Sequence, residues 1–486
     1  MIQPRSLSPL LLLTLGLLVS SEELPAQAPA AKSGRVFSAG AATSNITPPL
    51  GAGIVGGWNA PPATHIHDEL HTRCLVLDDG QTRLAFAIVD SVSVNREVFD
   101  EAKRLVHEAS GLAKEHMLMA ATHTHSGPSA RGESAFSYGR PLDEYQSFLA
   151  RRISDGVRRA INNLEPARIG WGAGDVPQHV FNRRWKMKPG TPMPNPFGGQ
   201  DKVVMNPGVG NPALLEPAGP TDPQVSFLSV QSMAGRPIAL LANYSLHYVG
   251  GTKGGHISAD YFGMFADRIQ QLLQADRQDP PFVGVMSNGT SGDVNNINFR
   301  VRGAKHAPYE KMRIVANDVA AEVFRVFQTI EHRDWVELKA AQTELTLQTR
   351  QPTPEMLDRA RQVLARPDSV SPFHRHEKTY AERTLKMAEW PKEISIILQA
   401  FRIGELGIAT TPFETFAETG LELKANSLIK PAFVIELANG GYGYLPTPGQ
   451  HALGGYETWL GTNRVEVEAS RKIVATLLEL LGALKR

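Results

Sequence analysis

The chain has 486 residues, 42% of them hydrophobic and 20% charged, and its 50 lysines and arginines almost balance its 49 aspartates and glutamates. This composition can build a large buried core and indicates a globular protein. No basic or acidic block is present, so the composition gives no support for nucleic-acid binding or a membrane-surface role. A single cysteine, Cys74, excludes an intrachain disulfide, and its apolar surroundings indicate a core residue.

The N-terminus has the pattern of a secretory signal peptide. A short basic start precedes an apolar run over 10–19, and Ala26-Gln27-Ala28 offers a small-x-small cleavage site. We therefore expect a signal peptide over 1–28, with an uncleaved anchor as the alternative, and a secreted or periplasmic location. A flexible segment over 29–40 and one large domain over 41–486 should follow, without a later transmembrane span.

The first part of this domain predicts a strand–helix–strand unit. After an opening strand at 41–49, strands are expected over 70–77 and 83–89, separated by the turn signal Asp78-Asp79-Gly80. Apolar residues at helical spacing predict a helix over 96–110 between Asn95 and Gly111, and a strand over 117–122 follows. The strands on either side of this helix should be parallel, with candidate ligands at their carboxyl ends.

Later apolar runs repeat this arrangement. They predict strands over 237–245, 282–287, 406–411 and 432–437, each followed by a polar segment that carries candidate ligands. The predicted fold class is α/β, with mixed, partly parallel sheets flanked by helices and a site at the carboxyl ends of the strands.

Four further segments have recognisable patterns. Residues 181–223, rich in Pro, Gly and Asn, are interpreted as a long active-site loop or lid. Residues 352–390 indicate a helical insertion or a cover over one sheet. Helices are also expected from Glu414 to about Lys424 and from about Arg464 to Leu484, the latter N-capped by Thr462.

Two histidines follow the expected strand over 117–122. On a strand, His123 and His125 would share one face, and imidazole is the commonest zinc ligand. The alternative is a hydrogen-bonded pair in a polar loop. His247 occupies an equivalent strand end, although it could equally be a packed or capping histidine. Asp260 could orient an imidazole or cap a helix.

Other candidates carry similar alternatives. Glu414 could bind metal, transfer a proton or simply complement a helix dipole. Tyr442, Tyr444 and Tyr456 could project into a site or pack in the core. Arg183 and Arg184 could clamp an oxyanion or lie in solvent.

The sequence argues against serine-triad and phosphate-loop chemistry. It has no Gly-x-Ser-x-Gly elbow in the required place, and Ser291, the serine considered as a nucleophile, lies in a turn context. Walker and dinucleotide-binding fingerprints are also absent.

In order along the chain, several motifs resemble the neutral/alkaline non-lysosomal ceramidase family, specifically its N-terminal catalytic domain. They are Asn45-Ile46-Thr47-Pro48-Pro49, Ile66-His67-Asp68, Ala121 to Pro128, His247, Gly292-Asp293, Glu414 and Tyr444-Leu445-Pro446-Thr447. The resemblance implies a zinc enzyme that hydrolyses the amide bond of N-acylated sphingoid bases. It implies His123, His247, Glu414 and Tyr444 as ligands of one zinc, with His123 favoured over His125. His125, Arg183 and Tyr456 would contact the substrate or the oxyanion.

The chain departs from this family at two points. The family motif Gly-Asp-x-Ser-Pro-Asn here reads Gly292-Asp293-Val294-Asn295-Asn296-Ile297, and Asn295 cannot replace a serine nucleophile. No immunoglobulin-like C-terminal domain is expected. Asp293 and Asn295 remain candidate site residues.

We therefore predict a zinc-dependent amidohydrolase that cleaves an N-acyl bond of a small, lipid-like substrate with zinc-activated water. The alternatives are a zinc esterase or amidase acting on a non-sphingolipid, and a non-catalytic lipid- or glycan-binding relative. The sequence does not predict the oligomeric state.

Overall fold

The computed structural model describes residues 35–128, 130–132, 136, 138–367 and 369–486. Val36–Arg486 form one compact unit. The expected signal peptide and the first half of the segment over 29–40 lie outside the described residues. Among the described helices, none is both long and apolar enough to cross a membrane.

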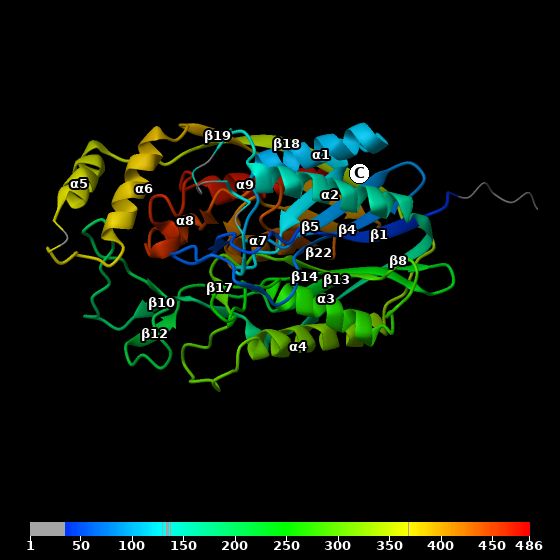
Figure 1. The fold of residues 1–486 in the computed structure, drawn as a ribbon, viewed down its shortest axis with the longest axis horizontal. Coiled ribbons are helices and arrows are strands. Elements are labelled where there is room, and N and C mark those ends of the chain that lie inside the picture. Colours follow the sequence, from blue (N-terminus) through cyan, green and yellow to red (C-terminus); the bar gives the residue numbers. More distant parts are fainter. Residues whose placement is uncertain (1–34, 129, 133–135, 137, 368) are drawn as a thin grey trace, which may run out of the picture. The chain divides into compact units, whose positions relative to one another are not determined.

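The largest sheet has eight strands and joins the N-terminal and middle parts of the chain (Figure 1). In spatial order they are β16 (Val283–Asn288), β14 (Pro237–Tyr244), β13 (Gln224–Ser232), β8 (Glu165–Asp175), β1 (Ser38–Asn45), β4 (His71–Asp78), β5 (Arg83–Val89) and β6 (Met117–Ala121). The pairs β5–β6 and β14–β16 are parallel, and the other neighbours are antiparallel. Helix α1 (Arg96–Ser110) links β5 to β6, which confirms the predicted strand–helix–strand unit.

A second sheet packs against one face of the first. Its order is β18 (Leu338–Gln348), β19 (Glu393–Ile403), β20 (Leu406–Thr410) and β22 (Ala432–Ile435), with β20 and β22 parallel. Apolar side chains of both sheets form one core, in which the rings of Phe86 and Phe401 lie 5.5 Å apart. Alternation along each strand gives this inner face its apolar residues.

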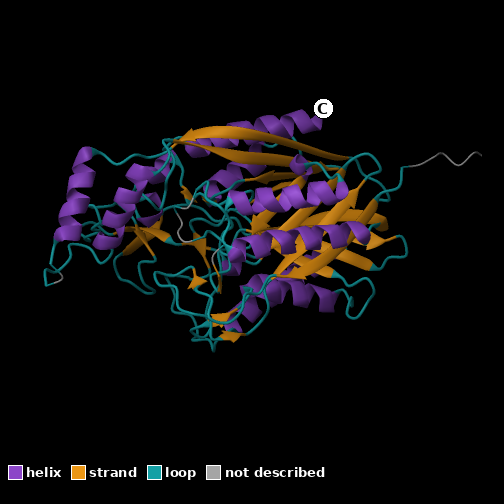
Figure 2. Ribbon diagram, turned by 45° about the horizontal axis from the view of Figure 1, so that its top comes forward, coloured by secondary structure: helices purple, strands orange, loops and turns teal. Residues whose placement is uncertain are grey.

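Helices cover the two outer faces, so the fold has four layers (Figure 2). Helices α1, α2 (Glu144–Asn162), α3 (Asp260–Leu272) and α4 (Glu310–Phe327) pack on the eight-stranded sheet. Helix α9 (Ala469–Lys485) packs on the four-stranded sheet, beside α7 (Ala417–Asn426). Cys74 is fully buried under α2, as predicted. The mixed α/β fold predicted from the sequence is confirmed.

Two excursions lie beside these layers rather than over either sheet (Figure 1). Residues 181–223 contain more regular structure than predicted, namely β9 (Phe181–Asn182) and a three-stranded sheet of β11 (Val204–Met205), β10 (Arg184–Met187) and β12 (Leu214–Pro217). Residues 352–390 form α5 (Pro354–Ala365) and α6 (Glu377–Glu389), which confirms the predicted helical insertion.

Short elements complete the described fold. They are β2 (Ile54–Val55), β3 (His65–Ile66), β7 (Gly127–Pro128), β15 (His256–Ile257), β17 (Val294–Asn295), β21 (Glu414–Thr415), β23 (Tyr444–Leu445) and α8 (Pro448–His451), with single 3₁₀ turns at Lys114–His116, Pro177–His179 and Tyr456–Thr458.

Three predicted boundaries were wrong. The first strand begins at Ser38, inside the segment expected to be flexible, because Ser38 already pairs with β4. The last helix begins at Ala469, and Thr462 does not cap it but hydrogen-bonds to the Tyr380 hydroxyl. Glu414 does not begin a helix, because its backbone pairs with Tyr444 between β21 and β23, and α7 starts at Ala417.

Candidate metal centre

The carboxyl ends of four strands bring five of the predicted site residues together. His123 and His125 follow β6, and His247 follows β14. Glu414 follows β20, and Tyr444 follows β22. Both sheets therefore contribute to one site, which agrees with the prediction that candidate ligands gather at strand ends.

The backbone at His123 departs from the predicted strand geometry. Strand β6 ends at Ala121, and His123 adopts a left-handed conformation with a φ of 76°. This conformation is costly for a residue other than glycine. His123 and His125 therefore do not converge through strand alternation, as the sequence suggested, but through a turn that brings their Nε2 atoms within 3.1 Å.

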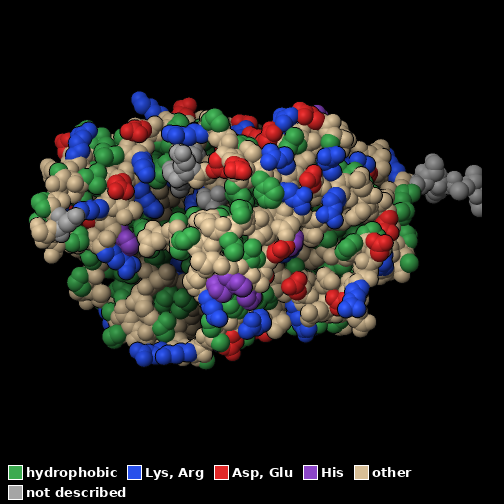
Figure 3. All heavy atoms as spheres, viewed as in Figure 1, with side chains coloured by type: hydrophobic (Ala, Val, Ile, Leu, Met, Phe, Trp, Pro, Cys, Tyr) green, Lys and Arg blue, Asp and Glu red, His purple; other side chains and the backbone are tan. Residues whose placement is uncertain are grey.

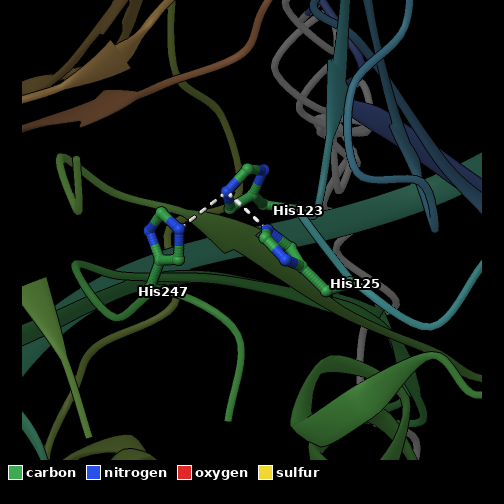
Figure 4. A group of neighbouring side chains, drawn as sticks. All are labelled: His123, His125 and His247. Carbon is green, nitrogen blue, oxygen red and sulfur yellow. Dashed lines mark hydrogen bonds between the residues drawn. The ribbon is translucent and has the colours of Figure 1, made fainter. Parts of the chain in front are cut away.

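The histidine rings present lone pairs to one another. Nδ1 of His123 lies 2.6 Å from the carbonyl oxygen of Val92, and Nδ1 of His247 lies 3.1 Å from that of Ser291. A carbonyl only accepts, so each Nδ1 carries the proton and each Nε2 has a lone pair. These two Nε2 atoms lie 2.9 Å apart (Figure 4), an arrangement that a cation between them would stabilise.

Burial keeps two of these imidazoles neutral. Desolvation, reinforced by the neighbouring His123 and Arg183, lowers the pKa of His247 well below its usual value. The pKa of His125 is lowered in the same direction, chiefly by desolvation. Neutral imidazole is the form that binds metal, so these rings are ready to act as ligands across the physiological pH range.

Glu414 adds a carboxylate to the cluster. Its Oε2 lies 3.4 Å from His123 Nε2 and 3.8 Å from His247 Nε2, and this buried atom accepts no hydrogen bond from the described residues. Burial would raise the pKa of Glu414, but His123, the Tyr444 hydroxyl and Arg183 outweigh it and hold the pKa below its usual value. Three imidazoles and an ionised carboxylate are a donor set that zinc accepts.

A second buried carboxylate lies behind the cluster. Glu436 accepts hydrogen bonds from the Ser291 hydroxyl (2.8 Å), the Asn288 amide (3.0 Å) and the Thr415 backbone N–H (2.7 Å). It thereby fixes the turn whose carbonyl oxygen orients His247 and the strand that carries Glu414. Ser291 is fully buried on the Nδ1 side of His247, so the serine weighed as a nucleophile does not face the converging Nε2 atoms.

Arg183 reaches the cluster from the excursion over 181–223. Its Nη1 lies 3.4 Å from His247 Nε2, and its Nη2 donates to the Gly292 carbonyl oxygen at 2.9 Å. Glu457 holds Arg183 through Nε at 2.9 Å and Arg184 through Nη1 at 2.6 Å, and the Glu457 side chain is fully buried. Arg183 is thus a fixed donor at the site, whereas Arg184 is structural rather than solvated.

A cavity of about 240 Å³ opens over the cluster. Its lining includes His123, His125, Glu414, Tyr444 and Tyr456. The rings of Tyr444 and Tyr456 lie 5.7 Å apart, edge to face. Of the two alternatives left open by the sequence, the structure thus places Tyr444 and Tyr456 on the wall of a cavity.

Four other candidates lie away from this lining. Asp293 accepts from the Ala417 N–H and the Asn182 amide, and Asn295 pairs with Asn206. Asp260 neither holds an imidazole nor occupies the N-cap position, because its carboxylate accepts backbone N–H groups of the loop after His247. Tyr442 packs against Phe413 in the core.

Sequence reasoning missed several residues of the site. A role for Glu436 could have been predicted, because an acidic residue inside the apolar run over 432–437 needs buried hydrogen-bond partners. Glu457 directly follows Tyr456, but nothing in its local sequence indicates two arginine partners. Trp58, which also lines the cavity, lies in a glycine-rich segment without periodicity.

The fold and site define a four-layer α/β protein with a buried histidine group that could hold a metal ion. A model of the family described as "Neutral/alkaline non-lysosomal ceramidase, N-terminal" matches residues 37–306. The chain belongs to this family, which confirms the resemblance inferred from its motifs.

Individual relatives support this assignment. The chain is 24% identical to neutral ceramidase A of Dictyostelium discoideum over 242 residues, which are 47% of this chain and 31% of that protein. The alignment thus spans less than a third of the relative. The crystal structure of neutral ceramidase from Pseudomonas aeruginosa has the same fold, with a TM-score of 0.66, 19% identity and coverage of 92% of this chain and 74% of that chain. A ceramidase structure complexed with C2 matches with a TM-score of 0.69, 18% identity and coverage of 93% and 75%.

Proposed function

We propose that this protein is an exported, zinc-dependent amidohydrolase that cleaves an N-acyl bond. The observation that carries the proposal is the convergence of His123, His125, His247 and Glu414 on one buried point. Family membership supports amide hydrolysis as the reaction. The signal-peptide pattern over 1–28 supports export to the periplasm or the exterior.

His123, His247, Glu414 and Tyr444 are proposed to hold one zinc per chain. His125, whose Nε2 lies 3.1 Å from that of His123, is close enough to serve as a further ligand or to contact the substrate. Zinc bound here would lower the pKa of a bound water towards about 7 and polarise the substrate carbonyl.

The surrounding side chains are proposed to position the substrate and move its protons. Arg183, fixed by Glu457, and the Tyr456 hydroxyl would donate to the developing oxyanion, a contribution of about 2.7–4 kcal/mol for a good donor. His125 would protonate the leaving amine. Direct attack by water fits this chain, because Asn295 has no nucleophilic oxygen and Ser291 lies behind His247.

An apolar cavity beside the site supports a lipid-like substrate. It measures about 250 Å³, shares Trp58 and Tyr456 with the cavity over the cluster, and is otherwise lined by residues that include Met193, Val203 and Trp459. A cavity of this kind suits an acyl chain, because its walls offer mainly apolar and aromatic contacts.

Two measurements test the proposal. Purified protein should contain about one zinc per chain, and turnover should be found on N-acyl amides within a panel that also includes matched esters. Turnover of esters alone would contradict amide hydrolysis, and zinc-free protein with full activity would contradict the metal site. Intact mass during turnover should show unmodified protein, since a trapped acyl adduct would refute direct water attack.

Replacing Gly56 with alanine should displace His125. Gly56 has a φ of 128°, and a Cβ at this position would lie 2.5 Å from Cγ of His125. We expect kcat/KM on an N-acyl amide to fall about 10²-fold, the effect of a displacement of about 1 Å in an active site. Gly51→Ala is the matched control, because Gly51 also has a positive φ, of 95°, but open space around it. Equal losses in both variants would assign the effect to backbone strain and contradict the role of His125.

A further inference from the structure

Three arginines line the cavity beside the proposed metal ligands. Arg131 follows the His123–His125 turn, Arg383 comes from α6, and Arg464 precedes α9. Glu414 is the one acidic residue among the described residues of this lining. On the face shown in Figure 3, by contrast, basic and acidic side chains are interspersed. Among the described residues, cationic side chains therefore predominate in this lining.

Arg383 is held by neutral groups. Its Nη1 donates to the hydroxyls of Tyr380 and Thr462, at 3.2 Å each, and its guanidinium lies 5.7 Å from the Trp58 ring centroid. These contacts fix its position over the cavity. No carboxylate of the described residues forms an ion pair with it, so these contacts leave its charge available to the cavity.

Arg464 is almost completely buried, with 6% of its surface exposed. Its guanidinium lies against the rings of Phe136 (4.7 Å) and Trp390 (5.5 Å). Burial, with the charges of Arg131 and Arg383, lowers its pKa to about 9. Burial also lowers the pKa of Arg131, and Arg383 contributes in the same direction. Arg383 thus lies close enough to Arg131 and Arg464 to act on both, and an anion bound by Arg383 would interact favourably with all three cations.

We propose that Arg131, Arg383 and Arg464 bind an anionic group of the substrate, so that the amide cleaved at the metal centre belongs to an N-acyl amino acid or a similar anion rather than to a neutral lipid amide. A guanidinium binds a carboxylate through two parallel N–H donors, and several guanidiniums around one cavity can also hold a sulfonate or phosphate. The apolar cavity beyond Trp58 and Tyr456 would take the acyl chain of the same molecule. This inference rests on the proposed function and specifies its substrate class.

The experiment compares substrates that differ only in charge. N-hexanoylglycine and N-hexanoylglycinamide have the same acyl chain and nearly the same size, and the corresponding pair built on 4-aminobutyrate extends the distance between amide and anion. We expect wild-type protein to prefer the anionic member of at least one pair by tenfold or more in kcat/KM. Arg383→Gln should reduce this ratio to near one, and Arg383→Lys should retain part of it.

A matched control separates the site from general charge effects. Arg361 lies on α5, is exposed, and forms an ion pair with Asp358 away from the cavity. Arg361→Gln should keep the wild-type ratio, and thermal unfolding should show that all variants are folded. Equal turnover of anionic and neutral members by wild-type protein would overturn the proposal, as would an unchanged ratio in Arg383→Gln.

A measurement of ligand binding tests the anion site independently of whether the protein hydrolyses amides. Trp58 lines the cavity, so its fluorescence reports on ligands there. If none of the amides is hydrolysed, the proposed function fails, but quenching by N-hexanoylglycine and not by N-hexanoylglycinamide would still support the anion site. Equal quenching by both, or quenching by neither, would overturn it.

Discussion

Replacing His123 with alanine is expected to remove zinc and activity together. His123 Nε2 lies 2.9 Å from His247 Nε2, 3.1 Å from His125 Nε2 and 3.4 Å from Glu414 Oε2, so it takes part in the three shortest contacts within the cluster. Metal catalysis supplies several kcal/mol of transition-state stabilisation, so kcat/KM should fall by about 10³-fold or more. Elemental analysis of the purified variant should find almost no zinc.

The control for this variant is His332→Ala. His332 is a partly buried histidine whose Nε2 contacts the Ser229 hydroxyl, outside the cluster. This variant should keep both zinc and activity. His123→Gln, which preserves most of the side-chain volume, tests whether loss of activity follows loss of metal rather than loss of the fold. Full zinc and full activity in His123→Ala would refute the site assignment.

Replacing Glu457 with glutamine should cause a large loss of stability. The carboxylate is fully buried between Arg183 and Arg184, at 2.9 Å and 2.6 Å, and its removal leaves two buried guanidiniums without their shared counter-ion. Breaking a buried ion pair by removing one partner costs about 3–5 kcal/mol. The change in free energy of unfolding should be measured from urea denaturation midpoints.

Glu468→Gln provides the comparison on the surface. Glu468 is half exposed and pairs with Arg471 at 2.9 Å, so its loss should cost about 0–1 kcal/mol. A difference of less than 1 kcal/mol between the two variants would contradict the structural role of Glu457. Glu457→Gln should also lower kcat, since it frees the guanidinium of Arg183 beside the metal centre.

The sequence allowed the mixed α/β class, with partly parallel sheets flanked by helices, to be predicted, because it depends on local patterns. Alternating and continuous apolar runs predicted the strands, and the polar residues after them made His123, His247 and Glu414 candidate ligands. The geometry of the site was less predictable. His123 adopts a positive φ, which no local pattern of histidine indicates, and Glu414 joins a short strand because Tyr444 pairs with it 30 positions later.

The charged surroundings of the site could not be predicted for a different reason. Glu457 binds Arg183 and Arg184 across more than 270 positions, and Arg383 and Thr462 meet across 79. The sequence around each partner gives no indication of the residue with which it pairs. Glu436 is different, because an acidic residue within an apolar run requires buried hydrogen-bond partners, which are Asn288 and Ser291 in the structure.

The attachment of α6 has a consequence for how such a protein can change over evolutionary time. The proposed metal ligands lie in segments that follow strands of the two packed sheets, whereas Arg383 belongs to a helical insertion that meets the cavity through Tyr380 and Thr462. Under the two proposals, substitutions along α6 would change the anion site while the proposed metal ligands stay in place. The two proposed sites draw on separate parts of the chain, so one can be altered without replacing the residues of the other.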